Sequence, residues 1–174
     1  MSKRTNFEKI PKDFYPTFDK SALVPAFVNS ISGNTYAEPC CGEGDLIDLL
    51  YHIAACKWQS DLEDRGYGEV KDAMKISSSD IGDVDLIITN PPYTKSVVLP
   101  MINHFTSLKP TWLLLPADWM HNIYFKPYLD KCSKIISIGR MSWMRDTKMK
   151  STENYCWYFW EDMENKNTTF IGRT

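Results

Sequence analysis

The chain has 174 residues, of which 43% are hydrophobic and 24% charged, ordinary values for one folded domain that argue against disorder or fibrous repeats. Its longest apolar runs have only the length of strands, so we expect no transmembrane span. The basic residues near the N-terminus are not followed by an apolar segment, so we expect no signal peptide. Five cysteines without a CxxC pair indicate reduced thiols, as in a cytoplasm.

The net charge of −2 gives no general case for nucleic-acid binding, but the charges are distributed unevenly. Residues 38–85 contain twelve acidic and four basic side chains, whereas residues 126–150 contain seven basic and two acidic ones. Charge alone is equally compatible with two solvated faces and with a surface for a polyanion.

Short apolar runs alternate with helical spacing along most of the chain, which is typical of a mainly parallel α/β sheet. Helices are expected at 45–55, 95–108 and 123–132. The last two strand-like runs leave no room for a crossover helix, so they should pair as a hairpin around a flexible polar loop at 144–154. The pattern predicts a single domain over residues 1–174 with an N-terminal arm at 1–12. Its seven expected strands are 35–38, 54–59, 70–76, 84–89, 111–115, 134–143 and 155–160.

The most specific motif is Asn90-Pro91-Pro92-Tyr93, which directly follows the expected strand 84–89. Two successive prolines impose a rigid, extended turn, and ligands of open α/β sheets bind at the carboxyl ends of strands. The Asn90 side-chain oxygen and a neighbouring carbonyl can each accept one N–H of a planar amine, while the Tyr93 ring stacks on it. A plain strand stop is the alternative interpretation.

A second motif, Glu38-Pro39-Cys40-Cys41-Gly42-Glu43-Gly44, lies between the first expected strand and the first expected helix. Its glycines let the backbone approach a ligand closely, although the full GxGxxG fingerprint is not met. Asp61 ends the second expected strand, where an acid can hold ribose hydroxyls. Asp72 can accept a hydrogen bond from the exocyclic amine of an adenine ring. Either acid is also compatible with a surface position.

Together these residues resemble the S-adenosylmethionine-dependent amino-methyltransferases of the NPPY type, in particular the DNA adenine-N6 methyltransferases. The resemblance rests on Glu38-Pro39-x-x-Gly42-x-Gly44, Asp61, Asp72 and Asn90–Tyr93, and it runs from about residue 13 to residue 160. Asp-Phe-Tyr-Pro-Thr at 13–17 is similar to the family's N-terminal cofactor motif, with Phe18 where the family has a proline. The resemblance implies a Rossmann-like class I methyltransferase fold, with a seven-stranded, mainly parallel sheet that ends in an antiparallel hairpin.

The resemblance also implies an activity and a set of site residues. The cofactor would be S-adenosylmethionine, and the reaction a direct methyl transfer to N6 of adenine in DNA, as in restriction-modification systems. Because the target-recognition domain of sequence-specific members is missing, the sequence preference should be short or loose. The implied catalytic residues are Asn90, Pro91, Pro92 and Tyr93. The implied cofactor-binding residues are Tyr15, Thr17, Glu38, Pro39, Cys40, Gly42, Gly44, Asp61, Asp72 and Asn90.

The identity of the acceptor and of the partners stays open at this level. The same motif occurs in enzymes that methylate RNA base amines or protein glutamines, and a cofactor-binding accessory subunit is the non-enzymatic alternative. The basic stretch favours a polyanion, with Arg145, Lys148 and Lys150 as the expected nucleic-acid contacts. No metal site is expected, because His52 and Cys56 give only two ligands. We expect a monomer or homodimer in the cytoplasm, or in the host cytoplasm of a phage.

Overall fold

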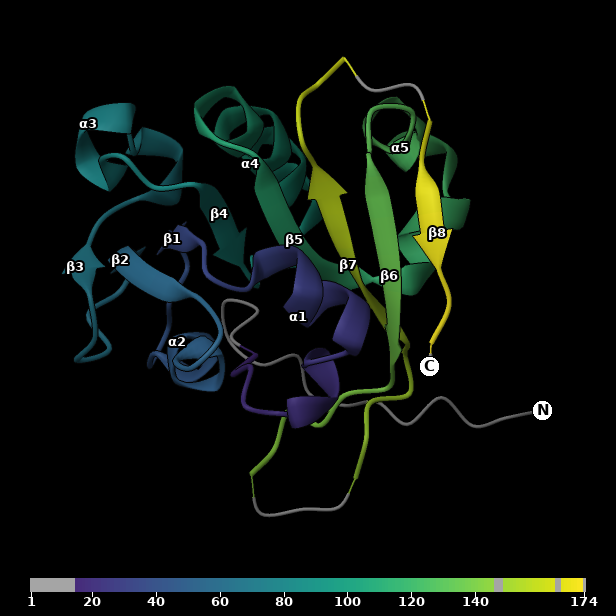
Figure 1. The fold of residues 1–174 in the computed structure, drawn as a ribbon, viewed down its shortest axis with the longest axis horizontal. Coiled ribbons are helices and arrows are strands. Elements are labelled where there is room, and N and C mark those ends of the chain that lie inside the picture. Colours follow the sequence, from purple (N-terminus) through teal and green to yellow (C-terminus); the bar gives the residue numbers. More distant parts are fainter. Residues whose placement is uncertain (1–14, 146–148, 165–166, 174) are drawn as a thin grey trace.

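Eight strands form a single sheet in the order β3-β2-β1-β4-β5-β7-β6-β8 (Figure 1). The computed structural model describes residues 15–145, 149–164 and 167–173. The strands from β3 to β5 are parallel, and β7 runs antiparallel to both β5 and β6. Their bounds are β1 Thr35–Glu38, β2 Ala55–Asp61, β3 Glu69–Val70, β4 Leu86–Thr89, β5 Thr111–Pro116, β6 Lys134–Gly139, β7 Tyr155–Trp160 and β8 Thr169–Ile171.

Helices cover both faces of this sheet, because its buried strands alternate their side chains between two cores. Trp112 and Leu114 of β5 belong to one core, which α1 (Pro25–Ile31) and α2 (Asp45–Leu50) cover. Leu113 and Leu115 belong to the other, beneath α3 (Ser78–Ile81), α4 (Lys95–Leu108) and α5 (Lys126–Leu129). Figure 1 shows α1 in front of the sheet and α4 behind it. Within the described ranges, no helix has the length and apolar character needed to cross a membrane.

The predicted hairpin is confirmed, and its loop opens at a defined edge of the sheet. Tyr155 at the start of β7 pairs with Pro116 at the end of β5 and with Gly139 at the end of β6. Since β4 and β5 are parallel, the loop between β6 and β7 leaves from the carboxyl edge, the same edge at which β4 ends. The chain therefore places this loop beside Asn90, which follows β4 directly.

The structure departs from the sequence prediction at several elements. A strand expected at 70–76 is reduced to Glu69–Val70, because the Asp72 carboxylate accepts a hydrogen bond from the Met74 N–H and caps the 3-10 helix η3 (Ala73–Lys75). The helix expected at 45–55 ends at Leu50, and the one expected at 123–132 is divided into η5 (Ile123–Phe125) and α5. The additional elements are α1, α3, β8 and the 3-10 helices η2 (Lys20–Ala22) and η4 (Ala117–His121).

The strand order reverses between β1 and β4. From β1 the chain continues outward to β2 and β3, whereas from β4 it continues to β5 on the opposite side. In open α/β sheets this switch point leaves a crevice outside the carboxyl ends of the strands, where ligands bind. Glu38 ends β1 and Asn90 follows β4, so both predicted motifs flank this crevice.

Candidate active site

A pocket lies at the switch point and contains about 930 Å³ of empty space, its open mouth included. Its walls come from the segment before η2, the loops after β1, β2 and β4, η3, and the helices α2 and α4. Of the predicted catalytic residues, Asn90 and Pro92 line it, whereas Pro91 and Tyr93 do not. Nine of the ten predicted cofactor residues line it, namely Tyr15, Thr17, Glu38, Pro39, Cys40, Gly42, Asp61, Asp72 and Asn90.

Glu38 is the most unusual side chain of the pocket. Its residue is 1% exposed, and its Oε2 atom has no hydrogen-bond partner among the described residues. Burial raises the pKa of the Glu38 carboxyl well above the ordinary value, and the nearby carboxylates of Asp61 and Asp45 raise it further. A buried carboxyl oxygen without a partner is costly unless a ligand satisfies it, so this wall of the pocket is suited to a cationic group.

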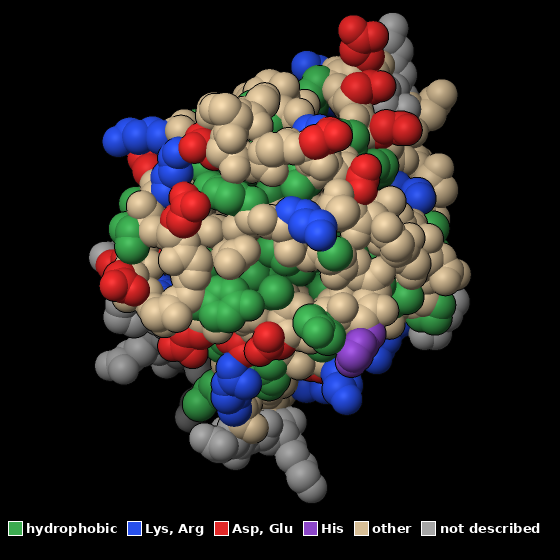
Figure 2. Space-filling model, turned by 60° about the vertical axis from the view of Figure 1, so that its left-hand side comes forward, with side chains coloured by type: hydrophobic (Ala, Val, Ile, Leu, Met, Phe, Trp, Pro, Cys, Tyr) green, Lys and Arg blue, Asp and Glu red, His purple; other side chains and the backbone are tan. Residues whose placement is uncertain are grey.

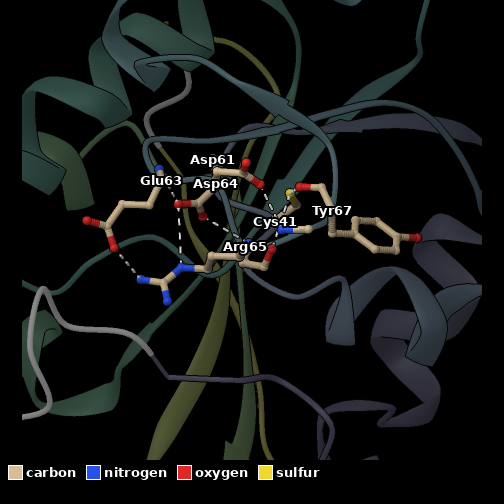
Figure 3. A network of polar contacts seen from close by, with 8 residues as sticks. Cys41, Asp61, Glu63, Asp64, Arg65 and Tyr67 are labelled. Atoms are coloured by element: carbon tan, nitrogen blue, oxygen red, sulfur yellow. Dashed lines mark hydrogen bonds and ion pairs between the residues drawn. The ribbon is translucent and has the colours of Figure 1, made fainter.

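Asp61 is held against the glycine loop by the hydrogen bonds that Figure 3 shows. Its Oδ2 accepts from the Gly42 N–H at 2.9 Å, and its Oδ1 accepts from the Glu63 N–H at 3.1 Å. The Arg65 guanidinium adds ion pairs to Asp61 at 3.8 Å and to Glu63 at 3.0 Å. Glu63 and Arg65 line the pocket as well, although neither was among the residues predicted from the sequence. The only sequence signal for Arg65 is its position four residues after Asp61.

Gly44 supports the glycine loop from outside the pocket. It is the N-cap of α2 with a φ of 87°, in the left-handed region that favours glycine. A Cβ atom at this position would lie 2.6 Å from the Tyr67 ring. The Cys41 thiol donates to the Tyr67 carbonyl at 3.4 Å, so the loop after β2 packs closely on the loop after β1. Gly44 thus permits close packing of two loops.

The end of the pocket next to η3 is more apolar and more open. Leu62, Met74 and Val97 line it, and each is a large exposed hydrophobic side chain. Figure 2, with the left-hand side of Figure 1 turned forward, shows hydrophobic side chains gathered on this face among charged ones. Asp72 also lines this part of the pocket while one of its oxygens caps η3. Such a surface is suited to the flat face of an aromatic ring, with one carboxylate at its edge.

Asn90 joins three parts of the site. Its Nδ2 donates to the Tyr15 carbonyl and to the Thr17 Oγ1, each at 2.9 Å. Its Oδ1 accepts from the Tyr93 hydroxyl at 2.7 Å. The segment around Thr17 is therefore fixed against the end of β4 even though Phe18 replaces the proline of the resembled motif. These bonds orient the Asn90 oxygen toward Tyr93 and away from the N-terminal segment.

Tyr93 lies within a cluster of aromatic rings. The Tyr15 ring stacks on it with 5.6 Å between centroids, and Tyr155 lies at 5.8 Å. Trp119 meets Tyr93 edge-on at 6.5 Å, and Trp143 contacts both Tyr15 and Tyr155. The sequence pattern alone places Tyr155 in a strand and gives no sign that it faces Tyr93.

The residues predicted to contact nucleic acid lie in different surroundings. Arg145 pairs through Nη2 with the Asp45 Oδ1, and its guanidinium carbon lies 5.0 Å from the centre of the Phe18 ring. Lys150 is exposed. Lys148 lies outside the described residues. The start of the loop between β6 and β7 is thus bound to α2, whose first residue, Asp45, lines the pocket.

The strand order, the terminal hairpin and the pocket at the switch point define the Rossmann-like fold of class I methyltransferases. No family model and no curated protein matches the sequence. Solved structures do match it. A candidate RNA methyltransferase from Pyrococcus horikoshii is 12% identical with a TM-score of 0.63, over 92% of this chain and 94% of that one.

Two further solved structures show the range of the likeness. A type I restriction-modification methyltransferase subunit from Streptococcus thermophilus is 11% identical with a TM-score of 0.58, over 92% of this chain and 47% of that one. Magnesium protoporphyrin IX methyltransferase from Synechocystis, with bound S-adenosylmethionine, is 18% identical with a TM-score of 0.50, over 77% of this chain and 74% of that one. The chain thus spans about half the length of the restriction subunit. At these identities the likeness concerns the fold.

Proposed function

We propose that this protein is an S-adenosylmethionine-dependent methyltransferase that acts on the N6 amine of adenine in DNA, with short or loose sequence preference. One observation carries the proposal. The Asn90–Tyr93 motif leaves the carboxyl end of β4 beside a pocket in which the buried Oε2 atom of Glu38 has no hydrogen-bond partner among the described residues. An acceptor site for an amine and a binding site for a cationic cofactor thus lie side by side.

The pocket residues fit S-adenosylmethionine, which supplies a methyl group on a positively charged sulfur when bound. Glu38 would offer its buried carboxyl to the cofactor ammonium, which would remove the cost of leaving the Oε2 atom without a partner. Asp61, already oriented by Gly42 and Arg65, offers its carboxylate to the ribose hydroxyls. Leu62 and Met74 line the apolar part of the pocket and would contact the adenine ring.

Asn90 is oriented to hold the acceptor amine. Its Nδ2 donates to the Tyr15 carbonyl and to the Thr17 hydroxyl, which turns Oδ1 toward the Tyr93 hydroxyl. A carbonyl oxygen has two lone pairs, so Oδ1 can accept from the Tyr93 hydroxyl and from an amine N–H together. With the Pro91 carbonyl accepting the second N–H, the nitrogen lone pair is localised and directed at the methyl carbon. The bound cofactor would supply its methyl group to this nitrogen as the carbon–sulfur bond is given up, and the amine would release one proton to solvent.

The choice of DNA as substrate rests on the surroundings of the amine site. Arg140 and Lys150 are exposed basic residues at the carboxyl edge of the sheet, where a phosphate backbone would pass. Tyr93 and its neighbouring rings offer a stacking surface for a base extruded from a duplex, a step that costs a few kcal/mol. An accessory subunit that only bound the cofactor would have no use for an amine clamp.

The test is transfer of a tritiated methyl group to duplex DNA, single-stranded DNA, RNA and a protein extract, with Asn90→Ala as the inactive control. Label in DNA recovered as N6-methyladenine supports the proposal. Sequencing that detects modified bases then measures the preference, and modification confined to one motif of about six base pairs or more would contradict loose reading. Label confined to RNA or protein would change the acceptor. A wild-type protein that binds no S-adenosylmethionine would overturn the proposal.

A further inference from the structure

The acids around the pocket need counter-charges, and one comes from a distant part of the sequence. Glu38, Asp45 and Asp61 all line the pocket, and Asp45 is 8% exposed. The cation paired with Asp45 is Arg145, one hundred residues further along the chain. It reaches this position because the loop between β6 and β7 leaves from the carboxyl edge of the sheet.

The position of Arg145 is defined on two sides. Asp45 holds its Nη2, and the Phe18 ring lies beside its guanidinium at a distance typical of a cation–π contact. Asp45 and Thr17, the neighbour of Phe18, both line the pocket. The guanidinium therefore lies at the rim between these two walls, with 57% of the side chain exposed.

We propose that Arg145 binds the α-carboxylate at the amino-acid end of the cofactor. This inference rests on the proposed function. The amino-acid end is a zwitterion, and Glu38 offers a partner only for its ammonium. A guanidinium carries five N–H donors in a planar fork, so it can pair with Asp45 and a second carboxylate at the same time. Arg145 thus becomes a cofactor-specificity residue and not primarily a phosphate contact.

The competing assignment is a contact to the nucleic-acid backbone. A phosphate contact requires an exposed side chain, and Arg140, Arg145 and Lys150 are all exposed. Arg145 differs in that its guanidinium pairs with Asp45, a buried acid of the pocket wall. The observed pairing therefore favours a ligand inside the pocket, and phosphate binding becomes one outcome of the test.

Two nucleosides separate these assignments. S-adenosylhomocysteine carries the amino-acid end, whereas 5′-methylthioadenosine lacks it. Calorimetry on the whole chain should show that Arg145→Ala weakens S-adenosylhomocysteine binding about tenfold or more and leaves 5′-methylthioadenosine binding unchanged. Arg145→Lys should restore part of the loss because it keeps the charge. The control is Lys131→Ala, an exposed basic residue that follows α5 and does not line the pocket, which should affect neither ligand.

Three outcomes would overturn the inference. Equal losses for both ligands would give Arg145 a structural role, and thermal melting of Arg145→Ala and Arg145→Lys would reveal a folding defect as its source. Unchanged affinity for both ligands with weaker DNA binding would assign Arg145 to phosphate. A wild-type protein that binds neither ligand would overturn the proposed function itself. If the wild type binds both ligands and Arg145→Ala binds both with the same affinities, only the role of Arg145 is overturned.

Discussion

The Tyr15 ring stacks on the Tyr93 ring, with 5.6 Å between centroids and an interplanar angle of 18°. The Tyr93 hydroxyl donates to Asn90, and the Asn90 amide donates to the Tyr15 carbonyl. Each of these three residues, which come from two distant segments of the chain, thus contacts the other two. An acceptor ring that stacks on Tyr93 has to displace Tyr15 from that face or use the opposite one.

The first prediction concerns Tyr93. Tyr93→Ala should weaken acceptor binding by roughly 1–3 kcal/mol if one base stacks there, while cofactor affinity stays nearly unchanged because Tyr93 does not line the cofactor pocket. Tyr93→Phe keeps the stacking surface and removes the hydroxyl that donates to Asn90, so it is the matched control. Fluorescence anisotropy with labelled DNA measures both. Equal acceptor affinity in wild type and Tyr93→Ala would contradict the stacking role.

Asn90 should matter for turnover more than for binding. Asn90→Ala removes a hydrogen bond that strengthens as the amine becomes tetrahedral, so the methyl-transfer rate should fall on the order of 100-fold. Because Asn90 also holds Tyr15 and Thr17, a smaller loss of cofactor affinity should accompany it. Single-turnover kinetics and calorimetry separate the two effects. Methylation at the wild-type rate would refute the amine clamp.

Glu38→Gln should raise the stability of the protein and lower its affinity for S-adenosylmethionine. Burial, with Asp61 and Asp45 nearby, raises the pKa of the Glu38 carboxyl above its ordinary value of 4.5. The unfolded chain then releases a proton that the folded chain keeps, so the contribution of Glu38 to stability falls as pH rises from 4.5 through the raised pKa. Relative to wild type, Glu38→Gln should melt at a higher temperature near neutral pH, with about 2–4 °C for each 1 kcal/mol gained.

The same substitution should weaken S-adenosylmethionine binding about tenfold or more, because an amide cannot neutralise an ammonium. In the wild type, affinity should rise with pH as the carboxyl ionises. Melting curves and calorimetry between pH 5 and pH 8 test both parts. A less stable variant that binds the cofactor normally would contradict this role for Glu38.

Gly44 should be intolerant of any side chain. Gly44→Ala combines a left-handed φ of 87° with a Cβ 2.6 Å from the Tyr67 ring, and should cost roughly 1–3 kcal/mol of unfolding free energy. Gly33→Ala is the control for backbone strain alone, since its φ is 80° and no heavy atom lies within 4 Å of the added Cβ. Chemical denaturation gives both values. Adding Tyr67→Ala to Gly44→Ala should recover part of the loss.

Sequence patterns predicted the order of the main elements because long apolar runs and proline stops report on burial and chain direction. The strand 111–115, the helix 95–108 and the terminal hairpin are all present, each within one or two residues at its ends except for the hairpin's first strand. That strand was expected to end at residue 143 but ends at Gly139, because the φ of 90° at Gly139 turns the chain. Short elements such as β8 contain too few residues for an alternation of apolar and polar side chains to be recognised in the sequence.

The pocket was predictable where a residue ends a strand and less so where it depends on loop packing. Glu38, Asp61 and Asn90 each lie at the carboxyl end of a strand, so topology alone brings them together. Arg65 lines the pocket from one loop and Arg145 reaches Asp45 of the pocket wall from another, and their positions depend on partners that the sequence does not identify. Ion pairs across one hundred residues leave no periodic signal.

The strand β8 pairs with β6 through Thr169, Phe170 and Ile171. β6 would otherwise present a row of unpaired backbone donors and acceptors, a template on which another molecule's strand can be added. β8 thus becomes the edge of the sheet, and an edge strand of three residues is a shorter template for intermolecular strand addition than β6 would be. A weakening of this pairing would affect aggregation during expression and storage before it affected catalysis, because the pocket lies at β1, β2 and β4, several strands away.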